Sequence, residues 1–153
     1  MPANRIKIAK DKAELVKSLV ASKDTTGPFQ TYVEVMVFAA ALGVKQKKRV
    51  PLEGIAKDLS PLRQDYFASS FILLINLLSI TETKDIRIIG DDDLADEQRI
   101  HIFEEYANGG LEILQNKLHG AVDYSERLLL VLSSERFKEE QHEEEFDLSK
   151  FLA

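Results

Sequence analysis

Apolar residues recur at helical spacing over most of the 153-residue chain. Side chains three or four positions apart lie on one face of a helix, so this spacing predicts helices with one buried face. We expect helices over about residues 11–22, 29–42, 71–83, 94–118 and 121–137. Gly43 is placed to end the second helix, and Gly109 with Gly110 to kink the fourth. The predicted fold class is mainly α, a compact multi-helix domain.

The first residues follow a different pattern, because Ile6 and Ile8 alternate with Arg5 and Lys7. Alternation with a period of two predicts a short N-terminal β-strand. Strand, helix, turn and helix is the order of ribbon-helix-helix proteins, in which two protomers pair their strands and lay the ribbon into the DNA major groove. Arg5 and Lys7 would then face DNA, and the protein would be a homo-oligomer. An ordinary edge strand with solvated cations explains the same alternation.

Two stretches are apolar almost all round. Residues 29–42 therefore read as a helix buried on several sides. The run 71–80 is the most hydrophobic, and its length and continuation favour a helix over a buried strand. The longest nearly unbroken apolar run, 35–44, is about half of the roughly 18–20 residues that cross a bilayer, so we expect no membrane span.

Charge divides along the chain. Residues 1–63 carry 12 Lys and Arg against 6 Asp and Glu, whereas residues 64–153 carry 8 against 20. A basic part attracts phosphate and an acidic part repels it, so DNA would meet the N-terminal part. The cations predicted to contact DNA are Arg5, Lys7, Lys45, Lys47, Lys48 and Arg49. Solubilising surface charge explains the acidic excess equally well.

The chain lacks cysteine, which excludes disulfides and thiolate chemistry and is compatible with a reducing compartment. Its first thirty residues lack the apolar core of a signal peptide. We therefore expect a cytoplasmic protein.

Candidate chemistry is sparse. The acidic cluster of Asp91, Asp93, Asp96 and Glu97 lacks the glycine and glutamate of a calcium loop, and a helix N-terminus explains its charge. His101 and Glu105 lie one helical turn apart, which indicates a surface pair. No catalytic triad order or phosphate-binding glycine loop occurs. We expect no enzyme and no cofactor. The alternative is a magnesium-dependent nuclease that uses Asp91, Asp93, Glu104 and Glu105.

The C-terminal residues form a separate segment in this interpretation. We expect a helical domain over 1–137 and an acidic, mobile tail over 138–153. The tail ends in apolar residues at Phe146, Leu148, Phe151 and Leu152, which either dock on a partner or pack back on the domain.

Three stretches, residues 37–43, 74–85 and 102–114, resemble the bacterial family of DNA phosphorothioation-associated protein 4, also called Dnd system-associated protein 4. The resemblance runs from about Asn4 to Arg136 and is most specific around Tyr106 to Leu114. Members are encoded beside systems that replace a non-bridging phosphate oxygen of DNA with sulfur and use the mark in phage defence. The start, Arg5 to Ile8, is also loosely similar to the small DNA-binding subunit of those systems.

The resemblance implies an accessory protein of a DNA-modification and defence system. Together with the charge division, it predicts that the basic N-terminal part contacts DNA or the protein components of the modification complex. The alternative is a protein-interaction adaptor that does not touch nucleic acid.

Overall fold

The computed structural model describes residues 4–23 and 27–152, with their side chains as far as residue 138. The helices are α1 (Ala13–Leu19), α2 (Tyr32–Lys45), α3 (Ser69–Thr83), α4 (Asp93–Leu118) and α5 (Tyr124–Leu152). Short 3-10 turns occur at η1 (Lys10–Lys12), η2 (Gln64–Tyr66) and η3 (Ile86–Ile89). The described residues contain isolated β-bridges and no sheet, which confirms the mainly α fold class.

The chain divides into two compact units, residues 1–116 and 117–153. The first unit holds α1, α2, α3 and most of α4, and the second holds the end of α4 and all of α5. Helix α5 continues beyond the end expected at residue 137, so the boundary predicted at 138 lies inside it. The side chains of the predicted C-terminal docking motif, residues 146–152, lie outside the described residues. No helix in the described part is long and apolar enough to cross a membrane.

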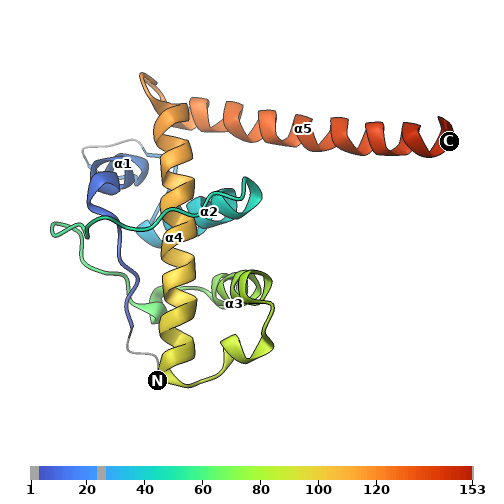
Figure 1. The fold of residues 1–153 in the computed structure, drawn as a ribbon. Coiled ribbons are helices and arrows are strands. Elements are labelled where there is room, and N and C mark those ends of the chain that lie inside the picture. The colour runs from blue at the N-terminus through green and yellow to red at the C-terminus, as the bar shows by residue number, and fades with distance from the viewer. Residues whose placement is uncertain (1–3, 24–26, 153) are drawn as a thin grey trace. The chain divides into compact units, whose positions relative to one another are not determined.

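Helix α4 supplies the centre of the first unit and is the longest element there (Figure 1). Phe103, Ala107, Leu111 and Leu114 are buried at spacings of three and four residues, so they form one inward face. The ring of Phe67 meets Phe103 edge-on at 5.9 Å between centroids. The stripe predicted for this helix therefore forms the core.

Helices α2 and α4 touch through their backbones at glycine. A Cβ on Gly110 would overlap the carbonyl of Ala39 in α2, and a Cβ on Gly43 would overlap the carbonyl of Tyr106 in α4. The roles predicted for these glycines were wrong for this reason. Gly43 does not end its helix, which continues to Lys45, and Gly110 lies within one continuous α4. Both glycines allow close packing instead.

The N-terminal segment is extended, with Ile6 and Ile8 buried and Arg5 and Lys7 exposed, as the alternation predicts. Its hydrogen bonds differ from those of a ribbon between protomers. Ile6 exchanges two 2.8 Å backbone bonds with Leu62 of the same chain, and Ile8 accepts from Ala56 at 2.8 Å. The bonded residues Ala56 and Leu62 follow the second helix, so one edge of the segment pairs within the chain.

Helix starts also differ from the expectation. Helix α2 begins three residues later than predicted because Thr31 caps it, accepting a 3.2 Å hydrogen bond from the Glu34 amide. Between α2 and α3, the described residues form no helix apart from η2. Their apolar residues instead cover the extended N-terminal segment, where Ala56 and Leu59 are buried.

Candidate functional site

The cations predicted near the N-terminus lie beside acidic residues of α4. The backbone N–H of Lys7 donates a 2.6 Å hydrogen bond to a carboxylate oxygen of Glu104. Lys7 also lines a hollow with Glu97, His101 and Glu104. The side chain of Arg5 is exposed and makes no hydrogen bond or ion pair with any described residue. The Lys7 bond uses only its backbone, so both cationic side chains are exposed to a ligand, and the Lys7 ammonium also acts electrostatically on Glu104.

The basic loop at residues 45–49 is fixed to α4 by its backbone. Lys47 adopts the left-handed conformation, with φ of 54°, which reverses the chain after α2. The N–H of Val50 donates to the carbonyl of Glu105 at 3.0 Å. The amide of Asn108 donates to the carbonyls of Val50 and Pro51 at 3.2 Å each. The loop is an ordered part of the first unit.

Arg49 is held by two carboxylates. Its Nε donates to Glu105 at 2.6 Å and its Nη1 to Glu82 of α3 at 2.7 Å. The hydroxyl of Tyr106 donates to Glu82 at 2.5 Å, and the guanidinium lies 5.9 Å from the Tyr106 ring centroid. Lys48 lies 3.4 Å from Glu112. Arg49 therefore joins α3 to α4, and its charge is matched locally.

Together these contacts change what the division of basic and acidic residues along the sequence implies for DNA binding. Carboxylates of α4 lie beside both cationic segments, although they are about one hundred residues from the first one in sequence. An ion pair satisfies both partners, so Lys48 and Arg49 offer less charge to a polyanion than the sequence suggests. The structure does not bring the six predicted residues into one patch of unpaired cations.

Three acidic groups of this region have shifted pKa values. Hydrogen bonds from Tyr106 and from Arg49 lower the pKa of Glu82. Burial raises the pKa of Glu104, against the opposing hydrogen bond from the Lys7 amide. Burial, with the hydrogen bond to Glu82, raises the pKa of the Tyr106 hydroxyl. Glu82 thus favours its charged form, and Glu104 disfavours it.

Of the carboxylates considered for metal or nuclease chemistry, Asp96, Glu104 and Glu105 accept hydrogen bonds within the first unit. Asp92, which was not among them, accepts a 3.1 Å hydrogen bond from the Ala95 amide at the start of α4. Glu105 also lies 3.3 Å from His101, so the predicted pair forms, but Glu105 is buried rather than on the surface. Over the described part of the chain, no three His, Asp or Glu side chains are grouped as metal ligands would be.

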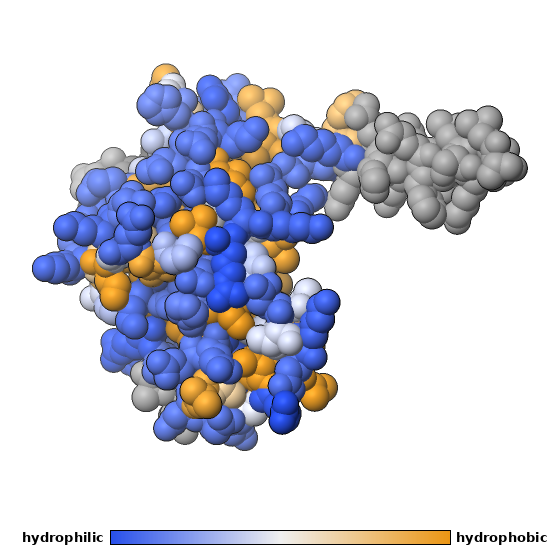
Figure 2. Space-filling model, in the orientation of Figure 1, coloured by the Kyte–Doolittle hydropathy of each residue, from blue (hydrophilic) through white to orange (hydrophobic). Residues whose placement is uncertain are grey.

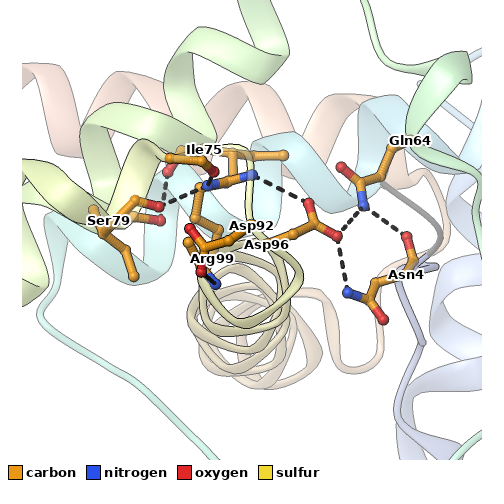
Figure 3. Close-up of polar contacts among 10 residues, drawn as sticks. Asn4, Gln64, Ile75, Ser79, Asp92, Asp96 and Arg99 are labelled. Atoms are coloured by element: carbon orange, nitrogen blue, oxygen red, sulfur yellow. Dashed lines mark hydrogen bonds and ion pairs between the residues drawn. The ribbon is translucent and has the colours of Figure 1, made fainter. Parts of the chain in front are cut away.

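Asp96 is the buried centre of a polar cluster that sequence reasoning missed. Figure 3 shows Asn4, Gln64 and Arg99 converging on its carboxylate. Asn4 donates to it at 2.8 Å, while Gln64 and Arg99 do so at 3.2 Å each. Arg99 also donates to the carbonyls of Ile88 and Gly90 at 2.6 and 2.8 Å. The cluster holds the N-terminal segment, η2 and the end of η3 against α4.

A cleft of about 670 Å³ lies beside this cluster, and we call it the arginine cleft. Its cations are Arg5, Arg63 and Arg99, and its apolar walls include Ile72 and Ile100. Arg63 forms a two-pronged pair with Asp65, at 3.1 and 2.6 Å, so its fork is occupied. The cleft forms where residues distant in sequence come together, so no local sequence motif predicts it.

The outer face of α3 is apolar and uncovered. Leu73 is 57% exposed and Leu77 is 54% exposed. The 3-10 turn η3 packs on α3 and exposes Ile86 and Ile89 as well. Figure 2 shows apolar patches on the surface over this part of the first unit. We call this surface, made by Leu73, Leu77, Ile86 and Ile89, the α3 face.

Comparison with curated proteins and with solved structures gave no match. The family model of DNA sulphur modification system-associated protein 4, however, matches residues 5–151. That span covers nearly the whole chain, including the arginine cleft, the basic loop and α3. The chain therefore belongs to the DNA sulphur modification system-associated protein 4 family, whose name identifies an accessory protein of such a system.

Proposed function

We propose that this protein is a non-enzymatic adaptor that docks on a protein component of the sulphur modification system through the α3 face. The observation that carries the proposal is the exposure of Leu73 and Leu77, at 57% and 54%, on an ordered helix. An exposed cluster of large apolar side chains costs solubility in a monomer, so such clusters mark interaction surfaces. A protein partner would remove these side chains from water.

The charge around the α3 face specifies the partner further. Residues 82–97, from the end of α3 into α4, carry seven Asp and Glu against two Lys and Arg. Three of these carboxylates pair with arginines, so the acidic excess comes from the exposed Asp91, Asp92, Asp93 and Glu97. Such a field repels DNA and attracts a basic segment. The face itself is apolar and lies on a helix, a surface suited to the apolar side of an amphipathic helix. The occupant we propose is a basic amphipathic segment of a system protein.

Co-expression with the modification proteins of the same system tests this function. The tagged wild-type chain should retain one component, and the variant Leu73→Ser with Leu77→Ser should lose it. Val122→Ser is the matched control, because Val122 is fully exposed and lies outside the α3 face. Capture by the double variant equal to that of the wild type would show that α3 is not the docking surface.

A second candidate function is DNA contact through the basic N-terminal part, and two cations favour it. Arg5 and Lys47 are exposed and have no ion pair with a described residue, so their charge is available to phosphate. Lys7 and Lys45, which belong to the same predicted set of DNA-contacting cations, are also exposed. The pairing of Lys48 and Arg49 makes this contact the weaker of the two proposals.

Binding of duplex DNA measured at several salt concentrations tests the second candidate. Each phosphate contact adds about 0.9 to the slope of log affinity against log salt, so Arg5→Ala with Lys47→Ala should lower that slope by roughly two. Lys57→Ala, an exposed cation outside the predicted set, is the control. An absence of binding at low salt would remove DNA from the function and leave the adaptor.

A further inference from the structure

We infer that the arginine cleft binds a nucleotide unit through its phosphate. The inference does not depend on docking at the α3 face, because its polar contacts come from Arg5 and Asn76, although Ile89 belongs both to that face and to the lining of the cleft. Its grounds are the size of the cleft, the mixture of side chains in its walls and the unpaired guanidinium at its edge.

The size of the cleft suits a small organic ligand. At about 670 Å³ it falls within the roughly 300–1,000 Å³ of typical ligand sites, and it is far larger than an inorganic ion requires. Its walls come from the N-terminal segment, η2, α3, η3 and α4, all within the first unit. Residues 4 and 64 are fixed to Asp96 by hydrogen bonds, so this side of the cleft is ordered before any ligand arrives (Figure 3).

Arg5 supplies the group for an anion. Arg99 and Arg63 already donate to carbonyls or carboxylates, whereas the guanidinium of Arg5 has no partner among the described residues. A guanidinium presents a planar fork that matches two oxygens of a phosphate. Arg63 pairs with Asp65 and Arg99 with the adjacent Asp96, so Arg5 is the arginine of the lining whose charge no described carboxylate pairs with. The cleft therefore favours an anionic ligand.

The other walls of the cleft suit a ligand that carries polar groups and a flat ring in addition to an anionic group. Asn76 of α3 is half-buried and makes no hydrogen bond with a described residue, so its amide can both donate and accept. Carboxamides recognise the edges of bases, and a carboxylate such as Asp91 accepts from ribose hydroxyls or base amines. Ile72, Ile75 and Ile100 offer apolar surface to the faces of a flat ring. Phosphate, hydroxyl or amine groups and a flat ring occur together in a nucleotide.

The test is calorimetric titration of the full chain with deoxyadenosine monophosphate and with deoxyadenosine. The monophosphate should bind, and the nucleoside should bind roughly tenfold more weakly or not at all, because it lacks the group that meets Arg5. A single-stranded oligonucleotide with a 5′-phosphate, compared with its 5′-hydroxyl form, separates a free nucleotide from a strand end. Binding of the phosphorylated strand alone also supports the proposal and identifies the strand end as the source.

Two variants locate the ligand. Arg5→Ala should weaken binding of the monophosphate, or of the phosphorylated strand, by about tenfold or more. Asn76→Leu should weaken it without removing a charge. Lys57→Ala, a cation outside the cleft, should leave it unchanged. Both cleft residues lack internal hydrogen bonds with described residues, so the variants should fold, which the thermal midpoint verifies.

Three results would overturn the inference. One is the absence of binding by both phosphate-bearing probes at millimolar concentration. Another is equal binding of deoxyadenosine and its monophosphate. The third is binding by Arg5→Ala and Asn76→Leu at wild-type affinity, which would place the ligand elsewhere on the protein.

Discussion

Helices α2 and α3 are both apolar almost all round, yet they differ in burial. Eight of the 14 residues of α2 are buried, against three of the 15 residues of α3. The described residues that are buried in α3 are Ile75, Leu78 and Ser79, all on one side. Two helices that are similarly apolar in sequence are therefore buried to different extents in the first unit.

Residue size explains part of the difference. Ala39, Ala40 and Gly43 let the backbone of α4 come against α2, so α2 lies deep in the unit. Helix α3 contacts α4 through longer side chains, including the Glu82 to Tyr106 hydrogen bond. Its outer leucines are not required by the packing of the unit. Helix α2 is therefore apolar for folding, whereas the exposed leucines of α3 form the surface that we propose for association.

The largest effect should follow from Gly110→Ala. A Cβ there would overlap the Ala39 backbone, so α2 and α4 would have to separate. We expect a loss of about 3 kcal/mol or more in the free energy of unfolding, measured with urea. Gly54→Ala is the control, because the new Cβ would meet Lys10 at an ordinary 3.6 Å. Equal stability of the two variants would contradict the close contact between the helices.

Met36→Ala should be the next most damaging change. Met36 of α2 is 1% exposed, and truncation of a fully buried methionine costs about 2–5 kcal/mol. Thermal or urea unfolding measures the loss. A cost below about 1 kcal/mol would mean that α2 is less enclosed than its burial indicates.

The carboxylates of α4 should separate into two classes. Glu105→Gln weakens the bond to Arg49, and we expect a cost of about 1–3 kcal/mol. Burial raises the pKa of the neighbouring Glu104, so its charge opposes folding at neutral pH, and a Gln carbonyl can accept the same Lys7 hydrogen bond. Glu104→Gln should therefore be neutral or stabilising in the same urea measurement.

Glu82, which links α3 to the rest of the unit, should give a smaller, pH-dependent effect. Its pKa is lower in the folded protein, so ionised Glu82 stabilises the fold above its unfolded pKa. That contribution is lost as pH falls through the folded pKa. Between about pH 5 and pH 3, the wild type should lose more stability than Glu82→Gln. Parallel stability curves for the two proteins would show that the Tyr106 and Arg49 bonds do not hold Glu82 ionised.

Leu77→Ala should have the smallest effect on folding. Leu77 is 54% exposed, and surface substitutions usually change stability by less than about 0.5 kcal/mol. In the same assay, the loss of stability in Leu77→Ala should therefore be several times smaller than the loss in Met36→Ala. A cost above about 2 kcal/mol would mean that the outer face of α3 is covered within this protein rather than by a partner.

Much of the fold followed from local spacing. The predicted helix at 94–118 forms almost as expected, because three- and four-residue repeats specify a buried face without reference to neighbours. The helix at 71–83, predicted from the length of its apolar run, also forms. The alternation of residues 5–8 likewise gave the correct inner and outer faces. Spacing could not show that these residues pair with Leu62 rather than with a second copy. The choice of edge partner depends on which segment is nearby in space.

The candidate sites depended still more on tertiary structure. The sequence by itself determined the helical class, the absence of thiol chemistry and the excess of cations before residue 64. Only the fold decided that Arg49 meets Glu82 and Glu105 while Arg5 borders a cleft without a partner. Charge is counted along a chain but acts over a few ångströms in space, so its effect is set by packing. The exposure of Leu73 and Leu77 has the same origin, because a helix buries an apolar face only where another element covers it.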